Sequence, residues 1–347
     1  MKFSSALAIA SALLAASPVL AKTESGKADS IRILSWNLRY DSKSNKITVD
    51  ETIDSLNATI PNDDEVSYFT NYTEHAWSDR RIGVSNEMLF NKPDVICVQE
   101  ALHRQVEDLL DLLPGFEYIG VGRDDGNQSG EYEAIFYRTE KIKVLDWSTF
   151  WLSDDPFEPS KYPGAGSYRS ATVGHLRTKS KSEFTAICTH WDDKSDEQRQ
   201  LAGSMIRYRG AYEAETTGNP VFAFGDFNSP STGGDSGGYK IITGESDMLT
   251  MNETFVETYN SSISDTFVFK DFLHETDAQF RMGHFATCTG FTEVDTQGST
   301  RVDFQLGGSN GGWSTTAFKV MNEFYDTGYH LSDHRPVISD VIVGYTD

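Results

Sequence analysis

Ser332-Asp333-His334-Arg335-Pro336 stands immediately before an apolar run rich in β-branched residues, at positions 337–343. Runs of this composition are typical of strands. The segment therefore places a carboxylate and an imidazole where a strand begins. Asp and Pro are also common turn residues, so the segment alone is compatible with a simple turn. The rest of the sequence decides between these two interpretations.

Seven further apolar runs predict strands, and most are bounded by Gly, Pro, Asp or Asn. They cover residues 31–36, 95–98, 117–121, 134–137, 184–189, 220–225 and 302–306. Two stretches with helical spacing, residues 102–113 and 194–208, lie between them. We predict an α/β protein with a strand-rich core, folded as one domain over residues 22–347. The polar, acidic stretch at about 41–78 is predicted to be a long surface insertion in that domain.

Several of these strands are followed by polar side chains suited to chemistry: Asn37, Glu100, His190, Asp226 and Asn228. Plain structural explanations exist for most of them. Asn37 can cap a turn, and His190 can be a half-buried core histidine. Asp226 and Asn228 can form an Asx-turn. Taken together with the segment before the last strand, they indicate a functional site at one rim of a sheet, where strand ends hold side chains rigidly.

The charge of the chain limits the substrates to be considered. Among 347 residues, 52 are acidic and 30 are basic, a formal net charge of −22. Such a surface repels phosphate backbones on average, so a polyanionic substrate needs a local basic or metal-bearing site. Arg80-Arg81 is too sparse to grip a duplex, and Arg207-Tyr208-Arg209 is predicted to lie on a helix surface rather than to stack bases.

The N-terminus has the pattern of a secretory leader. Met1-Lys2 is followed by an apolar, Ala-rich run over residues 7–20 and by Ala21. We predict a signal peptide at residues 1–21 and a secreted, monomeric protein without a transmembrane segment, since the run is shorter than a bilayer span. Five Asn-x-Ser/Thr sequons agree with that route and are candidate N-glycan sites: Asn57, Asn71, Asn127, Asn252 and Asn260.

Three cysteines, Cys97, Cys188 and Cys288, are too few for a disulfide framework. Cys97 and Cys188 lie within apolar, strand-like runs, and we interpret them as small buried side chains. Neither stands beside a basic cluster, which argues against a catalytic thiol. The sequence leaves the pairing of the three cysteines open.

Six short motifs follow one another along the chain: Trp36-Asn37, Gln99-Glu100, Thr189-His190, Gly225-Asp226-Phe227-Asn228, Arg301-Val302-Asp303 and Ser332-Asp333-His334-Arg335-Pro336. This ordered set resembles the endonuclease/exonuclease/phosphatase superfamily, and the resemblance runs from about residue 31 to residue 343. Segments at 122–126, 130–138 and 149–153 are similar to a secreted subgroup of that superfamily. The resemblance implies a deoxyribonuclease I-like fold of the α/β class. That fold is a four-layer α-β-β-α sandwich of two mixed β-sheets flanked by helices, with the site at one rim between the sheets.

The resemblance further implies a divalent-metal phosphoesterase, in which water attacks phosphorus in line with the leaving group. Mg²⁺ or Mn²⁺ suits carboxylate and carboxamide oxygen ligands. The implied ligands are Asn37 and Glu100, with Asp333 as a second-site or outer ligand.

Four further residues match the family's catalytic groups. Asp226 and Asn228 match the pair that positions the attacking water and holds a phosphate oxygen. His334 is expected to pair with Asp303, which fixes the tautomer and favours the imidazolium.

His190 is expected to donate to the scissile phosphate from the other side, oriented by Glu131. Arg169 matches an arginine of a Pro-Arg-x-x-Thr segment and is expected to bind phosphate, although Tyr168 stands where the family has proline. The sequence does not assign the general base to one of the two histidines.

The resemblance leaves the substrate open, because one fold serves many substrates. A phosphodiester or phosphomonoester is expected, in a nucleic acid (DNA or RNA), a phospholipid head group or a small phosphoester. The alternative is a non-catalytic binding protein on the same fold. Such a protein is expected to have lost catalytic residues, and here all of them are present.

Overall fold

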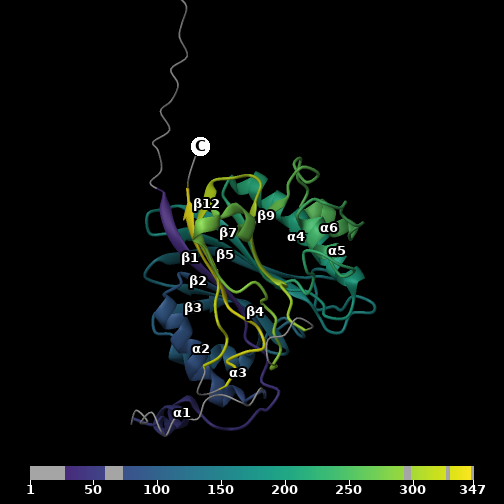
Figure 1. Ribbon diagram of the computed structural model, residues 1–347. Coiled ribbons are helices and arrows are strands. Elements are labelled where there is room, and N and C mark those ends of the chain that lie inside the picture. The colour runs from purple at the N-terminus through teal and green to yellow at the C-terminus, as the bar shows by residue number, and fades with distance from the viewer. Residues whose placement is uncertain (1–27, 59–72, 293–297, 326–328, 345–347) are drawn as a thin grey trace, which may run out of the picture.

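The computed structural model describes residues 28–58, 73–292, 298–325 and 329–344. The leader at 1–21 and the sequon at Asn71 lie outside these ranges. Two β-sheets stand at the centre of the molecule and helices lie on their outer sides (Figure 1). Within the described ranges, no helix combines the length and apolar character needed to cross a bilayer.

The first sheet has seven strands. In spatial order they are β10 (Arg281–Gly283), β12 (Trp313–Val320), β13 (Val337–Val343), β1 (Asp29–Asn37), β2 (Val95–Leu102), β4 (Glu131–Arg138) and β3 (Phe116–Ile119). β1 and β2 are parallel, with Asn37 opposite Gln99, and β13 runs antiparallel to β1.

The second sheet has six strands. In spatial order they are β5 (Ile142–Trp151), β6 (Ser170–Thr178), β7 (Glu183–His190), β8 (Val221–Asp226), β11 (Asp303–Gly308) and β9 (Phe269–Asp271). β7 and β8 are parallel, with His190 opposite Asp226, and β11 runs antiparallel to β8 with Asp303 opposite Asp226. Each sheet thus has one central parallel pair.

The helices are α1 (Val49–Ser55), α2 (Trp77–Asn91), α3 (His103–Leu112), α4 (Asp196–Thr217), α5 (Gly237–Ile242), α6 (Glu253–Thr258), α7 (Phe272–Glu275) and the 3₁₀ turn η2 (Ala278–Phe280). Apolar side chains of α2 and α3 pack on the outer face of the seven-stranded sheet. Those of α4, α5 and α6 pack on the outer face of the six-stranded sheet. The predicted four-layer α-β-β-α sandwich is therefore confirmed (Figure 1).

The central strands are continuous apolar runs because both of their faces are buried. In β1, Ile31 and Ile33 point between the sheets, while Leu34 and Trp36 pack beneath the helices. Successive side chains of a strand point to opposite faces, so each such strand contributes to two cores at once.

The sequence-based prediction of local structure is incomplete, and one part of it is wrong. Among the elements it did not include are β5, β6, β12 and α2. The last residues of the stretch at about 41–78 lie in α2, where Trp77 is buried and donates to Asp108. Helix α4 continues to Thr217. It buries the segment 207–209 that was expected on the surface, and Arg207 donates to the Phe267 carbonyl.

Arg80 is a structural residue rather than a surface cation. Its buried guanidinium donates to the carbonyls of Leu38, Arg39, His75 and Leu331. Burial lowers its pKa to about 10, so it remains charged at neutral pH. The side chain ties the segment after β1 to the segment before β13.

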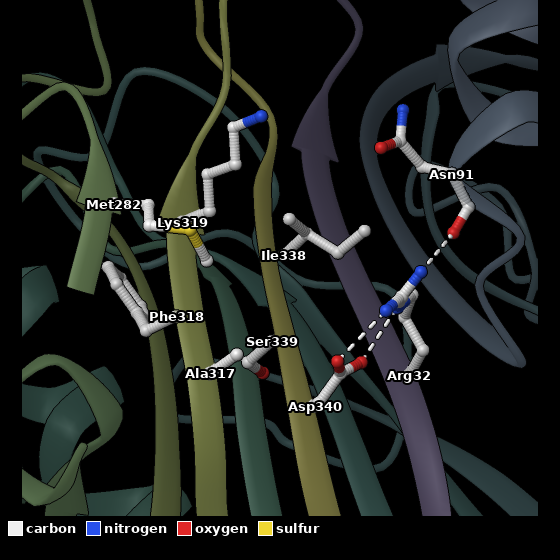
Figure 2. Close-up of a pocket in the computed structure, with 9 residues that line it drawn as sticks. All are labelled: Arg32, Asn91, Met282, Ala317, Phe318, Lys319, Ile338, Ser339 and Asp340. Carbon is white, nitrogen blue, oxygen red and sulfur yellow. Dashed lines mark hydrogen bonds and ion pairs between the residues drawn. The ribbon is translucent and has the colours of Figure 1, made fainter. Parts of the chain in front are cut away.

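The outer face of the seven-stranded sheet carries a groove beside α2, lined largely by apolar groups of β12 and β13 (Figure 2). Within it, Arg32 forms a bidentate ion pair with Asp340 and donates to the Asn91 carbonyl. The groove contains none of the polar strand-end residues.

Cys97 of β2 and Cys188 of β7 form a disulfide that links the two sheets, with Cα atoms 5.6 Å apart. The two residues are fully buried, but the interpretation as separate apolar side chains is wrong. Cys288 is the remaining free cysteine. The cross-link joins residues 91 positions apart, so it removes considerable freedom from the unfolded chain.

We predict that the double variant Cys97→Ala/Cys188→Ala has a free energy of unfolding lower by about 4.6 kcal/mol, the chain-entropy value for a loop of this length. Urea unfolding would measure the difference. Cys288→Ala serves as the matched control and should shift the value by less than about 1 kcal/mol. Equal stability of the double variant and the wild type would show that the cross-link contributes nothing.

Candidate active site

The parallel pairs β1/β2 and β7/β8 bring four strand ends to one rim of the sandwich. Asn37 ends β1, Glu100 stands near the end of β2, His190 ends β7 and Asp226 ends β8. Asp303 joins them because it opens β11 directly opposite Asp226. Residues that are distant in the sequence thereby meet at the rim.

Glu100 reaches the site through a local distortion of its strand. The pairing of β2 with β4 shifts register between Val98 and Ala101, which is a β-bulge. Glu100 within this bulge has φ of +62°, a conformation that non-glycine residues rarely adopt. The bulge turns the carboxylate toward Asn37 and toward the Tyr40 amide, which donates to it at 3.1 Å.

Asn37 connects the two sheets at this rim. Its Nδ2 donates to Glu100 Oε1 at 3.0 Å and to Asp226 Oδ2 at 3.0 Å. Its Oδ1 accepts from the Arg39 amide. The fully buried carboxamide thus lies between a carboxylate of its own sheet and a carboxylate of the other.

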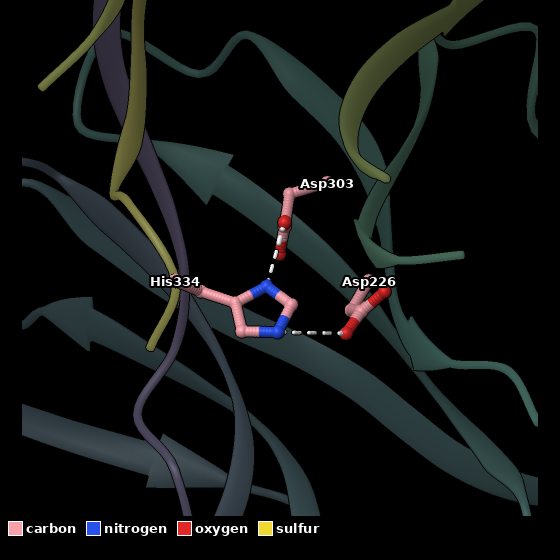
Figure 3. A group of neighbouring side chains, drawn as sticks. All are labelled: Asp226, Asp303 and His334. Atoms are coloured by element: carbon pink, nitrogen blue, oxygen red, sulfur yellow. Dashed lines mark hydrogen bonds and ion pairs between the residues drawn. The ribbon is translucent and has the colours of Figure 1, made fainter. Parts of the chain in front are cut away.

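Asp303, His334 and Asp226 form a buried row (Figure 3). His334 Nδ1 lies 2.8 Å from Asp303 Oδ2, and His334 Nε2 lies 3.7 Å from Asp226 Oδ2. The loop that carries His334 is fixed by the Trp36 indole, which donates to the His334 carbonyl. Ser332 also donates to the Asn37 carbonyl at 2.6 Å.

The charges in this row depend on one another. Burial, reinforced by the Asp303 carboxylate, raises the pKa of Asp226 to about 7. Burial opposes charge on His334 as well, but the carboxylates of Asp303 and Asp226 outweigh it and hold the pKa of His334 well above its ordinary value. His334 is therefore an imidazolium at neutral pH, flanked by two acidic groups.

His190 has the opposite charge state. Burial, together with Arg169 and Arg123, holds the pKa of His190 well below its ordinary value, so the ring is neutral. Its Nε2 lies 3.2 Å from Asn228 Nδ2 and 3.6 Å from Asp226 Oδ2. Asn228 Nδ2 also donates to the Trp191 carbonyl, which fixes the carboxamide beside the ring.

Glu131 is held by an arginine rather than by His190. Its Oε2 lies 2.7 Å from Arg123 Nη2 but 3.9 Å from His190 Nδ1, which is too long for a direct hydrogen bond. Arg123 also contacts the fully buried Glu133 at 3.3 Å. Burial raises the pKa of Glu131 to about 7, although Arg123 opposes the shift.

Arg169 is positioned by two carboxylates. Its Nε donates to Asp192 at 3.1 Å and its Nη2 to Asp193 at 2.9 Å. Asp192 is itself fixed by the backbone amides of Gly166 and Ser167. The buried Nη1 of Arg169 makes no hydrogen bond to the described residues. Its Nε and Nη2 are both paired, so the expected two-nitrogen contact with phosphate would require Arg169 to give up Asp192 or Asp193.

These groups line one cavity of about 340 Å³. Of the predicted site residues, it is lined by Glu100, Glu131, Arg169, His190, Asp226, Asn228 and His334. Asn37 and Asp303 lie behind this lining, hydrogen-bonded to Asp226 and His334 respectively. Asp333 lies beside them: burial and Glu100 raise its pKa, against the opposing influence of His334 and Arg39.

Five lining residues had no assigned role in the sequence: Arg39, Tyr40, Arg123, Ser167 and Asp193. Arg39 and Tyr40 follow β1 directly, and Asp193 follows β7 by three positions, so their place after strand ends was a usable signal. Arg123 lies in the segment 122–126 that resembles the family, although no role was assigned to it. Ser167 comes from a loop that meets the cavity through tertiary packing, and the local sequence gives no comparable signal.

Two groups of residues are candidates for a cation. Glu100 and Asp226 present carboxylate oxygens to the same atom of Asn37, and a turn of that carboxamide would add a third oxygen. Asp226, Asp303 and His334 also have ligand atoms within 4.8 Å of one another. The first group fits a hard cation better, because it offers oxygen and because His334 is already protonated and bound to Asp303.

The arrangement can orient a water molecule at Asp226 and surround a phosphate with donors from Asn228, Arg169 and His334. Preorganised donors and charges of this kind stabilise negative charge that develops during reaction. The site therefore has the parts needed for phosphoester hydrolysis.

Comparisons with known proteins agree with this chemistry. Nocturnin of Drosophila melanogaster is 24% identical over 217 residues, which cover 58% of this chain and 29% of that protein. The Ccr4 exoribonuclease subunit of the CCR4-Not complex of Debaryomyces hansenii is 23% identical over 184 residues, covering 44% of this chain and 22% of that protein. The chain thus spans less than a third of the length of these two relatives.

Solved structures match over nearly the whole length. An endonuclease/exonuclease/phosphatase from Bacteroides vulgatus has a TM-score of 0.68 and 26% identity, covering 91% of this chain and 99% of that chain. A mannosyl-6-phosphatase from Bacteroides thetaiotaomicron shares the fold, with a TM-score of 0.67 and 23% identity, covering 90% and 99%.

The sequence profile of the Endonuclease/Exonuclease/phosphatase family matches residues 34–334. This span begins in β1 and ends at His334, so it includes every strand end that forms the cavity. Members of the family depend on a divalent metal ion. The chain belongs to the endonuclease/exonuclease/phosphatase family.

Proposed function

We propose that this protein is a secreted, Mg²⁺- or Mn²⁺-dependent phosphoesterase that cleaves a phosphodiester or phosphomonoester by in-line attack of water. One observation carries the proposal. A carboxylate with a raised pKa, Asp226, lies between a charged His334 and a neutral His190 in the cavity that Glu100 also lines. Titratable neighbours with such divergent charge states are typical of acid–base sites.

The roles follow from these charge states. We assign the proton of the attacking water to Asp226 in its ionised form. Its Oδ2 is the basic atom that lies between the two histidines, 3.6 Å from His190 Nε2 and 3.7 Å from His334 Nε2. His334 is already charged, so it stabilises negative charge rather than acting as the base. Asp303 is a positioning residue that holds His334 Nδ1.

The phosphate is held from several directions. Arg169 and Asn228 line the cavity beside the phosphate position, and His190 stands beside Asn228. Glu100 and Asn37, with Asp333 farther out, would hold the cation, which neutralises phosphate oxygens and charge on the leaving group when bound. The bond between phosphorus and the ester oxygen breaks, that oxygen takes up a proton from solvent and leaves as the alcohol, and the water oxygen remains on phosphorus.

The names of the related proteins are compatible with several substrates: one is an exoribonuclease subunit and another a mannosyl-6-phosphatase. Nuclease activity on DNA or RNA and phospholipid head-group hydrolysis therefore remain alternatives within the proposal. A non-catalytic binding protein is disfavoured because the catalytic residues are all present and converge on one cavity.

Secretion is supported by the leader-like residues 1–21 and by the disulfide, since disulfides persist in oxidising compartments. We also propose a monomer with N-glycans. Asn57, Asn127 and Asn260 are exposed. Asn252 instead caps α6 and donates to the Asp154 carbonyl, so a glycan there would replace one of the two N–H groups of a nitrogen already used in the fold.

Replacing either central catalytic group should nearly abolish turnover. We predict that Asp226→Ala and His334→Ala each lower kcat by at least about a hundredfold, the scale of a lost acid–base or charge-stabilising partner. Steady-state hydrolysis of an aryl phosphate ester with Mg²⁺ would measure it. His274→Ala, at an exposed histidine of α7, is the control and should be neutral. Near-wild-type turnover in the first two variants would refute the assignment.

Removal of the metal should abolish activity, and binding of the metal should depend on the Glu100 carboxylate. We predict that EDTA stops hydrolysis and that millimolar Mg²⁺ raises the Tm of the wild type, because a ligand stabilises the folded state that binds it. Glu100→Gln should lose this Tm shift, whereas His334→Ala and the surface control Glu107→Gln should keep it. If His334→Ala loses the shift and Glu100→Gln keeps it, the cation belongs with Asp226, Asp303 and His334.

Because the pKa of Glu131 is raised, we predict that the free energy of unfolding of the metal-free protein depends on pH. A carboxyl group with a folded-state pKa of about 7 favours folding below its unfolded pKa of about 4.3, and this contribution is lost as pH rises through about 7. Glu131→Gln cannot ionise at this position. As pH rises from about 4 to about 8, its free energy of unfolding should therefore increase relative to that of the wild type, by on the order of 2 kcal/mol in total. Urea unfolding at several pH values would test this. A pH-independent difference would contradict the raised pKa.

A further inference from the structure

A second cavity of about 320 Å³ adjoins the catalytic cavity. The two share three lining residues, Arg123, Glu131 and Ser167. A substrate whose phosphate lies beside Asp226 and Arg169 would therefore extend its organic part past these shared residues. The walls of the second cavity then decide which organic parts fit.

Those walls are rich in hydrogen-bonding groups of both kinds. Lys161 offers an ammonium donor, Asp124 a carboxylate acceptor, and Tyr168 and Ser167 hydroxyls that donate and accept. The exposed Asp124 lies directly against Gly130, where a Cβ atom would come within 2.5 Å of its carboxyl carbon. Tyr168 adds an aromatic ring to an otherwise polar wall.

The same walls disfavour the other substrate classes. A nucleic acid would bring a second phosphate toward Asp124 and Glu131, and the guanidinium of Arg123 is already paired with Glu131 and Glu133. Of the charged groups on this wall, the Lys161 ammonium is the one left to attract that phosphate, against the two carboxyl groups. Acyl chains would find little apolar surface, since the lining has one aliphatic side chain, Leu102.

We propose that this second cavity binds the hydroxyl-bearing part of the substrate, and that the preferred substrate is the phosphate ester of a sugar or polyol. The inference rests on the proposed phosphoesterase function and specifies its substrate class. An uncharged polyol uses alternating donors and acceptors without bringing a second negative charge to Asp124 and Glu131. Such a pocket fixes orientation through a few convergent polar groups.

The test compares three probes with purified full-length enzyme and Mg²⁺: a hexose 6-phosphate, an aryl phosphate and a short single-stranded DNA. We expect kcat/KM for the hexose phosphate to exceed that for the aryl phosphate by at least about tenfold. Lys161→Ala and Tyr168→Ala should each raise KM for the hexose phosphate about tenfold. Lys143→Ala, at an exposed lysine of β5 that lines neither cavity, is the matched control.

The outcomes separate the two proposals. If none of the three probes is hydrolysed, the phosphoesterase proposal fails and the substrate inference fails with it. If the aryl phosphate or DNA is hydrolysed with equal or greater kcat/KM than the hexose phosphate, the substrate inference alone is overturned. It is overturned as well if Lys161→Ala and Tyr168→Ala leave KM for the hexose phosphate at the wild-type value.

Discussion

The Asn37 carboxamide joins the two halves of the molecule at the point where they form the site. Its Nδ2 donates to Glu100 in its own sheet and to Asp226 in the facing sheet. The separation of these two carboxylates is therefore set by the packing of one sheet on the other. Deeper in the sandwich, the disulfide between Cys97 and Cys188 fixes the same two sheets to each other. The geometry of the cavity is thus a property of the whole sandwich rather than of any loop.

The cavity wall contains several cationic side chains, although the chain as a whole is strongly acidic. The protein carries a net charge of −22, yet the cavity gathers Arg39, Arg123 and Arg169 at its wall. Each of these arginines is paired with carboxylates, which fix its position and balance part of its positive charge. This arrangement offers donors to one phosphate without making a basic surface, which explains how an acidic protein can act on an anionic ester.

The family fold is shared at 23–26% identity over nearly the entire length of two bacterial structures. Conservation of a fold at that level does not transfer a substrate, because specificity is determined by the side chains around the site. In this chain those side chains come from loops outside the strand ends, with Lys161 and Tyr168 on one wall of the second cavity. In the function proposed here, the strand ends supply the groups for the reaction and the loops select the ester.

The sequence by itself determined the class of fold and most of the strand-end residues. Strands buried on both faces must be continuous apolar runs, so β1, β2, β7, β8 and β13 were visible, as were the polar residues at their ends. β5 was not visible, because its outer residues are exposed and polar positions interrupt the pattern. Only the tertiary structure decided the rest. The disulfide, the pairing of Arg123 with Glu131 and the unpartnered Nη1 of Arg169 arise where segments distant in sequence come within a few ångströms, and local sequence patterns do not encode such distances.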